Sequence, residues 1–434
     1  MEPIKLYGVF LIVLTITIIV MYKDTSQGTE MFVTPLKSRP STNNVELQKH
    51  IHTLRLERKN LEYRLKLNQA CTDQNTPQHT RLDPEKIQDS VWVERKHSIL
   101  YCAITKVGTT FWKRTLTVLA TGGNNIHVSP FELRLGDVKL KHFETYRSRM
   151  ERKEMGEFLK GVNSFIFVRD PYSRLFSGYE HKLYNPNLSF WRSHGKKVVT
   201  TIRKNPSKES LTYGHDVKFA EFVKYILNQK DNNETINTHF KPMHEKCDPC
   251  GLPYDYIGHL ETFKEDAEYL FDKWRNTFSD FNINFGDFEK ETVLDTARSL
   301  VGRLFNSWKS LKGNFKYPFY NLVLRVWSDF QIRGYLSKDI PLPFKQKDVK
   351  TLNVEKMMRA VSNALEVKVN KTAVKLQRQE ALQQAYRTVP LEDMERLHDF
   401  VLKDCQLFGY DDRPKALFDR NNVVESKHLY LAGI

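Results

Sequence analysis

Hydrophobic and polar positions divide the chain into segments of clearly different character. The first is a run of 17 residues without charge, Leu6 to Tyr22, bounded by Lys5 and Lys23. A run of this length lies at the short end of what crosses a bilayer. A cleaved signal peptide fits less well, because Ile18 to Tyr22 offers no small residue for a cleavage site. The pattern predicts a short tail at 1–5 and a transmembrane signal anchor at 6–22.

Polar residues predominate from 23 to 90, which we interpret as a stem. Within it, residues 45–69 follow a heptad pattern of about three repeats, which is typical of a helix with one apolar seam. This helix either packs on the folded body or pairs with a second copy as a coiled coil, and the sequence favours neither. The seam consists of Leu47, Ile51, Leu54, Leu61 and Leu65, with Arg58 at its one interrupted position.

Two strand–turn–helix units open the folded body, which begins near Val91. The first has a strand at 98–104, a turn at 105–110 and a helix at 111–120. The second has a charged helix at 141–160, a strand at 164–168, a turn at 169–174 and a helix at 175–183. Such units predict an α/β domain with a parallel sheet, whose ligands gather at the carboxyl ends of the strands.

The remaining pattern is mainly helical. Helices are predicted at 214–229 and 259–275, and the stretch 271–390 reads as mostly helical, without a functional signature. We expect one domain over 91–415 and a C-terminal tail at 416–434.

The net charge limits the classes of binding partner, and the cysteine content limits the possible disulfide and metal sites. The formal net charge of +15 suits an anionic partner such as a nucleotide, an acidic lipid, a nucleic acid or an acidic polysaccharide. The five cysteines are too few for a disulfide scaffold, and their odd number leaves at least one free or paired with another chain. Cys247 and Cys250 suit a zinc half-site, a redox pair or a bridge. No second Cys/His pair stands at metal-ligand spacing, so no metal site is predicted.

The first turn has the chemistry of a phosphate site. Gly108 lets the backbone approach a phosphate at a helix N-terminus, Thr109 and Thr110 add hydroxyls, and Lys106 adds a positive charge. A Walker loop places its lysine after the second glycine, whereas this lysine precedes Gly108, so a nucleotide hydrolase is excluded.

The second turn also suits a phosphate. Arg169 at a strand end can fork onto a phosphate, and Ser177 can donate to the same group from the following helix. Pro171 fixes the turn. Asp170 either caps the new helix or pairs with an arginine, and a salt bridge between Asp170 and Arg174 is the purely structural alternative.

Together these motifs resemble the Golgi carbohydrate sulfotransferases, in particular the branch with chondroitin and dermatan 4-sulfotransferases. The resemblance covers roughly 92–270 and 391–411. It is carried by Lys106-Val-Gly-Thr-Thr-Phe-Trp-Lys-Arg114, Phe167-Val-Arg-Asp-Pro-Tyr-Ser-Arg-Leu-Phe-Ser177, His239-Phe-Lys-Pro242, Cys247-Asp-Pro-Cys250, Tyr254-Asp-Tyr-Ile-Gly-His-Leu-Glu-Thr262 and Asp404-Cys-Gln-Leu-Phe-Gly-Tyr410. Thr105 departs from the family's usual proline, Cys405 stands where an aromatic is common, and 271–390 is a divergent, longer segment.

This resemblance implies a P-loop-like sulfotransferase fold, with a central parallel sheet flanked by helices, and transfer of a sulfuryl group from 3′-phosphoadenosine 5′-phosphosulfate (PAPS) to a glycan hydroxyl. It suggests a GalNAc-containing glycosaminoglycan as acceptor and a type II Golgi membrane protein with a lumenal catalytic domain. The first motif would hold the 5′-phosphosulfate: Thr105, Lys106, Val107, Gly108, Thr109, Thr110 and Phe111. The second would hold the 3′-phosphate through Arg169 and Ser177, within the segment Asp170, Pro171, Tyr172, Ser173, Arg174, Leu175 and Phe176.

The reaction needs a general base for the acceptor hydroxyl, and Lys106 would stabilise the leaving phosphate. His239 is the first choice for the base, with His142 and His127 as alternatives. A basic groove for the acceptor is predicted after the second motif, at Lys182, Arg192, Lys196, Lys197, Arg203 and Lys204. Sequons at Asn187, Asn233 and Asn370 suit a lumenal glycoprotein.

Two other classes of protein stay open. A membrane-anchored, non-enzymatic binder of acidic glycans would need basic patches but not two phosphate turns. A nucleic-acid binder is disfavoured, because the chain has a predicted anchor and sequons, and no recognised nucleic-acid motif.

Overall fold

The computed structural model describes residues 42–73, 90–121, 129–133, 138, 144–145, 160–311, 313, 315–421 and 428–433. The chain divides between His52 and Thr53 into two compact units, and the packing described below belongs to the second. The predicted anchor at 6–22 and the alternative bases His127 and His142 lie outside the described residues. None of the helices within the described ranges is both long enough and apolar enough to cross a bilayer.

A five-stranded mixed sheet lies at the centre of the second unit. Its strands, in the order β3-β1-β2-β4-β5, are β1 (Val91–Glu94), β2 (Ile99–Cys102), β3 (Glu144–Thr145), β4 (Asn163–Val168) and β5 (Tyr256–His259). Strands β2, β4 and β5 run parallel, and β1 and β3 are antiparallel additions beside β2. The predicted parallel pair is confirmed, but the sheet is mixed, and β3 occupies part of the range expected to be helical.

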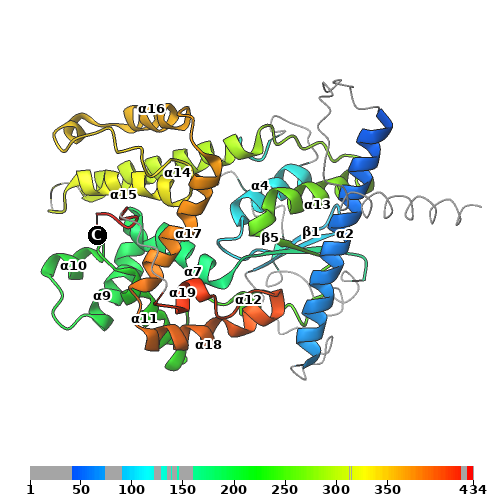
Figure 1. Cartoon of the computed structure of the whole chain (residues 1–434), viewed down its shortest axis with the longest axis horizontal. Coiled ribbons are helices and arrows are strands. Elements are labelled where there is room, and N and C mark those ends of the chain that lie inside the picture. Colours follow the sequence, from blue (N-terminus) through cyan, green and yellow to red (C-terminus); the bar gives the residue numbers. More distant parts are fainter. Residues whose placement is uncertain are drawn as a thin grey trace, which may run out of the picture. The chain divides into compact units, whose positions relative to one another are not determined.

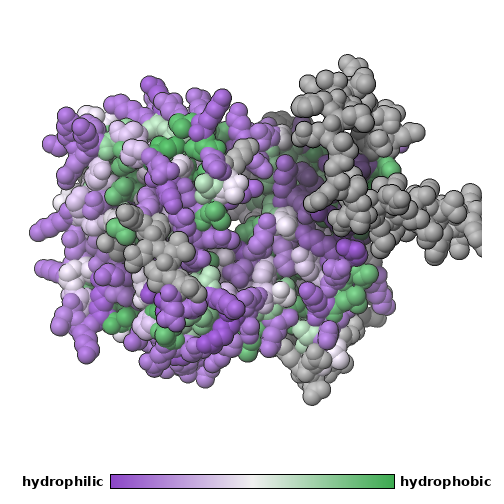
Figure 2. Space-filling model, in the orientation of Figure 1, coloured by the Kyte–Doolittle hydropathy of each residue, from purple (hydrophilic) through white to green (hydrophobic). Residues whose placement is uncertain are grey.

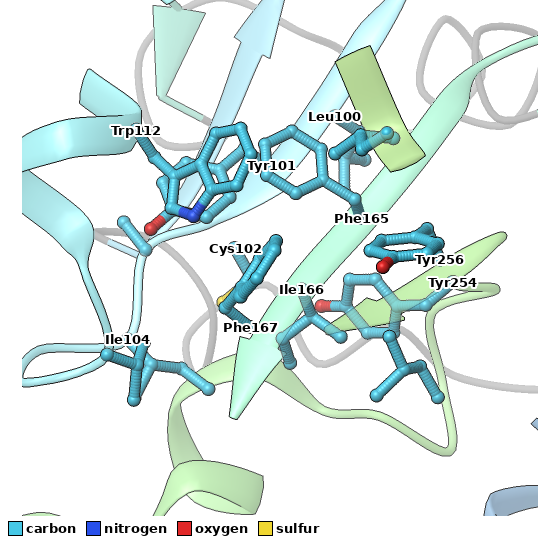
Figure 3. Packing of buried hydrophobic residues seen from close by; sticks show 14 of the residues in the cluster. Leu100, Tyr101, Cys102, Ile104, Trp112, Phe165, Ile166, Phe167, Tyr254 and Tyr256 are labelled. Carbon is cyan, nitrogen blue, oxygen red and sulfur yellow. The ribbon is translucent and has the colours of Figure 1, made fainter. Parts of the chain in front are cut away.

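The parallel strands are short and almost wholly buried because both sheet faces are covered. Tyr101 stacks on Phe165 at 4.7 Å between ring centroids, and Trp112 packs edge-on to Phe165 at 4.8 Å. Figure 3 shows these rings converging from β2, β4 and the first helix after β2. This packing fixes the strand ends from which both motif turns emerge.

Helices surround the sheet and continue into a larger helical region that contains most of the second half of the chain (Figure 1). The helices are α4 (Thr109–Ala120), α7 (Pro171–Tyr179), α8 (Leu188–Phe190), α9 (Lys196–Ile202), α10 (Lys208–Tyr213), α11 (Phe219–Asp231), α12 (Met243–Cys247), α13 (Phe263–Thr277), α14 (Phe288–Leu311), α15 (Phe319–Ile332), α16 (Val354–Leu365), α17 (Lys371–Arg387), α18 (Leu391–Phe408) and α19 (Lys415–Phe418). Two π-helical turns, η3 (Glu180–Tyr184) and η4 (Trp191–Gly195), and two 3₁₀ turns, η5 (Leu260–Thr262) and η6 (Asp348–Thr351), join them.

The heptad segment forms a single helix, α2 (Thr42–Asp73). Its Asn60 amide donates to the Asp255 carbonyl at 2.9 Å and accepts from the Ile257 amide at 3.0 Å. These two bonds satisfy backbone groups along β5, an edge strand that would otherwise be open. The helix therefore packs on the body, but through Leu56, Asn60, Tyr63, Leu67 and Cys71 rather than through the heptad seam, which stays exposed.

Two disulfides join distant segments. Cys71 at the end of α2 pairs with Cys250, and Cys102 at the end of β2 pairs with Cys247. Cys247 and Cys250 therefore form no bridge with each other, and no zinc half-site. Cys405 is free and buried, and burial raises the pKa of its thiol above the usual value.

Candidate functional site

The first motif forms a tight turn between β2 and α4. Gly108 is the N-cap of α4 at φ +86°, and Lys106 also has a positive φ of 73°. No side chain caps this helix end, so the amides of its first turn remain available to an anion. The site predicted from the glycine and lysine spacing therefore has the backbone geometry that an anion site requires.

Side chains of the first motif divide into two groups. Val107 and Phe111 are buried in the aromatic core, where they hold the turn and leave little surface for a ligand. The Thr109 hydroxyl donates to the carbonyl of Ile104, so it is already used within the turn. Thr110 is exposed at the mouth of the turn.

Lys106 is half-buried, and among the described residues its ammonium makes no hydrogen bond or ion pair. Burial lowers its pKa well below the usual value, and the neighbouring charges of Arg333, Arg169 and Lys182 lower it further, against an opposing effect of Glu180. An unpaired, partly desolvated cation surrounded by other cations is stabilised by a bound anion. The geometry therefore fits the phosphorylated donor that the first motif was expected to hold.

The second motif begins α7 directly after β4. Asp170 caps the helix by accepting a hydrogen bond from the Ser173 amide at 2.7 Å, and Pro171 occupies the first turn. The alternative salt bridge between Asp170 and Arg174 is wrong, because Arg174 donates to the carbonyl of Lys241 instead. The helix packs against the core through the buried side chains of Tyr172, Leu175 and Phe176.

Both motifs meet at one edge of the sheet. The Arg169 guanidinium donates through Nη1 to the Lys106 carbonyl at 3.3 Å. This contact is possible because β2 and β4 are adjacent and parallel, so their carboxyl ends lie together. Burial lowers the pKa of Arg169 to about 10. Ser177 is buried about two turns along α7, the helix that begins directly after Arg169 and Asp170.

The block after residue 237 lies against this edge. The Thr105 hydroxyl donates to the Thr238 carbonyl at 2.9 Å, and a Cβ added at Gly178 would lie 3.4 Å from the His239 carbonyl. His239 is thus held between the donor turn and α7. Burial lowers its pKa to about 3, and the positive charges of Lys182, Lys106 and Lys246 lower it further.

The C-terminal signature has a structural role. Asp404 accepts hydrogen bonds from the Met243 amide at 2.7 Å and the His244 amide at 2.9 Å, and so fixes the start of α12. The Tyr410 hydroxyl donates to Glu261 at 3.0 Å, whose other oxygen accepts from the Asp170 amide. The distant signature therefore holds both the His239 block and the second motif in place.

The divergent segment 271–390 supplies three arginines that sequence reasoning did not find. Arg333 and Arg378 both pair with Glu180, which is fully buried immediately after α7. Arg303 donates to the His181 carbonyl at 3.3 Å. No local motif marks these arginines, because their importance depends on helices α14, α15 and α17 folding back on η3.

The predicted basic run is only partly available to a ligand. Arg192, Lys196 and Lys197 line a surface groove of about 870 Å³ with residues of α11. Arg203 instead pairs with Asp216 and Glu221, so its charge stabilises the fold. The Lys182 ammonium lies over the Phe190 ring at 4.8 Å.

On the face shown in Figure 2, hydrophilic residues predominate and apolar ones form small separate groups.

Fold and site together define an α/β protein with the geometry of an anion site where its parallel strands end. The sulfotransferase family model matches residues 89–292. Carbohydrate sulfotransferase 11 of Rattus norvegicus is 31% identical over 260 residues, which are 59% of this chain and 71% of the relative. Carbohydrate sulfotransferase 8 of Mus musculus is 28% identical over 300 residues, 68% of each chain. No solved structure matches the chain.

The chain therefore belongs to the sulfotransferase family, and it is an enzyme that transfers sulfuryl groups. The family implies PAPS as the sulfate donor, in agreement with the expectation from the two motifs.

Proposed function

We propose that the enzyme binds PAPS across the two motifs and transfers its sulfuryl group to a hydroxyl of a glycan. The turn 105–111 would hold the 5′-phosphosulfate, and Arg169 and Ser177 would hold the 3′-phosphate. The observation that carries this proposal is the contact between the Arg169 guanidinium and the Lys106 carbonyl, which holds the two motifs against each other.

The residues suggest a division of labour in the transfer. When bound, PAPS would supply an activated sulfuryl group, and negative charge would build on the bridging oxygen of its leaving 5′-phosphate. Lys106 and the first-turn amides of α4 are the groups that stabilise such charge. His239 is neutral at neutral pH, because its pKa is lowered to about 3, and a neutral imidazole can accept the acceptor's proton.

The acceptor we propose is a GalNAc-containing glycosaminoglycan such as chondroitin or dermatan. The relatives named as carbohydrate sulfotransferases support a carbohydrate acceptor. Arg192, Lys196 and Lys197 offer an acidic polymer a positively charged surface groove.

A lumenal setting is also proposed, as a type II Golgi membrane protein anchored by residues 6–22. Two disulfides support an oxidising compartment. The sequon residues Asn233 and Asn370 are exposed, as glycosylation requires, whereas Asn187 is half-buried and its side-chain oxygen caps α8.

The exposed seam of α2 supports a homodimer through the stem. Leu47, Ile51, Leu54, Leu61 and Leu65 are each at least half exposed, although the opposite face of the helix packs on the body. Apolar residues at heptad spacing bury well against an identical helix. Replacing Leu54 and Leu61 by Asp should convert the dimer to a monomer in sedimentation, and an unchanged sedimentation coefficient would reject the pairing.

Radiolabelled PAPS and desulfated chondroitin test the function directly. We expect sulfate incorporation by the wild-type chain, and a loss of kcat/KM of roughly 100- to 1,000-fold for Lys106→Ala. Arg169→Ala should weaken binding of adenosine 3′,5′-bisphosphate about 10- to 100-fold, since a charged hydrogen bond is lost. Lys350→Ala, an exposed lysine outside the site, is the matched control.

Full activity of both site variants would reject the donor assignment. A panel of desulfated chondroitin, dermatan, heparan and keratan acceptors, assayed with the same donor, identifies the sugar. Incorporation into none of them would reject the proposed acceptor class.

A further inference from the structure

A chain of hydrogen bonds extends from His239 away from the donor turn. His239 Nδ1 lies 2.8 Å from Asn237 Oδ1, Asn237 Nδ2 lies 3.0 Å from His194 Nε2, and His194 Nδ1 lies 2.8 Å from Ser193 Oγ. Ser193 in turn donates to the Ser189 carbonyl at 2.9 Å. His194 comes from the π-helical turn η4, and π turns are frequent at functional sites.

Every bond in this chain has a determined direction. The His239 backbone amide also donates to Asn237 Oδ1, at 3.0 Å, so the Asn237 oxygen must face His239 and its NH₂ must face His194. His239 therefore carries its proton on Nδ1. His194 accepts at Nε2 and donates from Nδ1 to Ser193.

The remaining nitrogen of His239 is free. Nε2 makes no hydrogen bond within the described part of the chain. It is also not fully buried, so a ligand can reach it. Phe190 packs edge-on to the His239 ring at 5.4 Å between centroids and stacks on His194 at 4.3 Å, so both rings are held on one aromatic support. The charged and titratable groups that act most strongly on His239 are Lys182, Lys106, Lys246 and His194.

We propose that Asn237 is a positioning residue that fixes His239 in the tautomer with a free Nε2 lone pair, and that His194 and Ser193 hold Asn237 in that orientation. This inference rests on the proposed function, in which His239 is the base. Nε2 takes the acceptor's hydroxyl proton as the acceptor oxygen bonds to sulfur. The bond between sulfur and the bridging oxygen breaks, and its electron pair leaves with the 5′-phosphate.

The test compares Asn237→Ala and Asn237→Asp in the full-length enzyme. Asn237→Ala should lower kcat roughly 10- to 100-fold, with the KM for PAPS and the affinity for adenosine 3′,5′-bisphosphate unchanged. Asn237→Asp keeps an oxygen acceptor for Nδ1, so the variant should keep most of the activity at pH values above the pKa of His239. Its carboxylate favours the imidazolium, so the acid limb of the kcat–pH profile should move to higher pH.

Further variants separate the two levels of the proposal. His194→Ala should give a smaller loss of kcat than Asn237→Ala, and Asn306→Ala, an exposed asparagine on α14, should behave as wild type. An active His239→Ala enzyme would overturn the base assignment itself. If His239→Ala is inactive, two results would overturn only the positioning role of Asn237. One is a wild-type kcat in the Asn237 variants, and the other is an unshifted acid limb in the Asn237→Asp profile. If Asn237→Ala fails to fold, the Asn237→Asp profile decides.

Discussion

Thr105 joins two motifs that lie 133 residues apart in the chain. The resembling family usually has proline at this position, which has no side-chain donor. Here the hydroxyl donates to the Thr238 carbonyl, next to His239. The departure from the family pattern therefore adds a link between the donor turn and the proposed base.

Gly108 is the residue on which the donor turn depends most. Its φ of +86° disfavours any other L residue, and an added Cβ would lie 2.7 Å from Phe263 Cε2. Gly108→Ala should destabilise the fold by about 1–3 kcal/mol and weaken nucleotide binding, as measured by urea unfolding and calorimetry. Gly302→Ala is the control, because its Cβ would meet nothing within 4 Å, and equal effects of the two changes would contradict the argument.

Lys106 should take up protons when the nucleotide binds. Its pKa is held well below the usual value by burial and by neighbouring cations, so a growing fraction is neutral as the pH rises through that lowered pKa. A bound polyanion raises the pKa again, which couples binding to proton uptake. Calorimetric binding of adenosine 3′,5′-bisphosphate in buffers of different ionisation enthalpy measures this uptake.

Lys106→Arg is the matched comparison for this measurement, because arginine stays charged at any accessible pH. The variant should bind the same nucleotide with less proton uptake in the alkaline range. Uptake of the same size in both proteins would assign the protons to the ligand phosphates or to another group.

At the scale of elements, helices α14, α15 and α17 act on the site through the π-helical turn η3. Glu180 is buried, and Arg333 and Arg378 hold its pKa below the usual value although burial alone would raise it. The Arg378 guanidinium also lies over Phe176 of α7 at 4.7 Å. The divergent segment thus braces the second motif with charge pairs that the motif itself does not contain.

Glu180→Gln should be strongly destabilising. The change removes the carboxylate that Arg333 and Arg378 share. Arg333 keeps its pair with Asp329, but Arg378 loses its ion pair in a buried setting, a loss that costs about 3–5 kcal/mol. Urea unfolding checks the loss of stability, with the exposed Glu366→Gln as control, expected within about 0.5 kcal/mol of wild type. A change of less than 1 kcal/mol for Glu180→Gln would show that the ion cluster does not brace α7.

Local pattern was sufficient for some elements and not for others. The runs at 98–104 and 164–168 are apolar because both sheet faces are covered, and both were predicted as strands and observed as such. The four-residue strands β1 and β5 were missed. β1 pairs with the nearby β2 and the distant β3, and β5 pairs with the distant β4, so pairing rather than their own sequence pattern defines them. Helix α2 was predicted, but not the face it buries, which is set by Asn60 pairing with β5.

At the scale of the whole molecule, the site residues also fall into two groups: those that local sequence predicts and those that only the tertiary fold brings in. The glycine, lysine and arginine spacings predicted the two turns, because each turn is built from consecutive residues. Asn237, His194 and the arginines of the divergent segment were not found, since only the tertiary fold brings them to the sheet edge. The disulfide partners of Cys247 and Cys250 were likewise set by chain paths that no local spacing encodes.

The net charge of +15 gives the whole molecule a further testable property. If an acidic polymer is attracted along the groove of Arg192, Lys196 and Lys197, salt should screen that attraction. The KM for chondroitin should rise roughly 3- to 10-fold between about 50 and 300 mM NaCl.

A neutral oligosaccharide acceptor controls for salt effects on the donor, whose phosphates are also charged. Its KM should change little over the same range, because it lacks the charge that the groove attracts. Replacing Arg192, Lys196 and Lys197 together by alanine should raise the chondroitin KM at low salt and flatten its salt dependence. If the triple variant kept the wild-type slope, the attraction would belong to the charge of the whole chain, and the groove would have no special part in binding the acceptor.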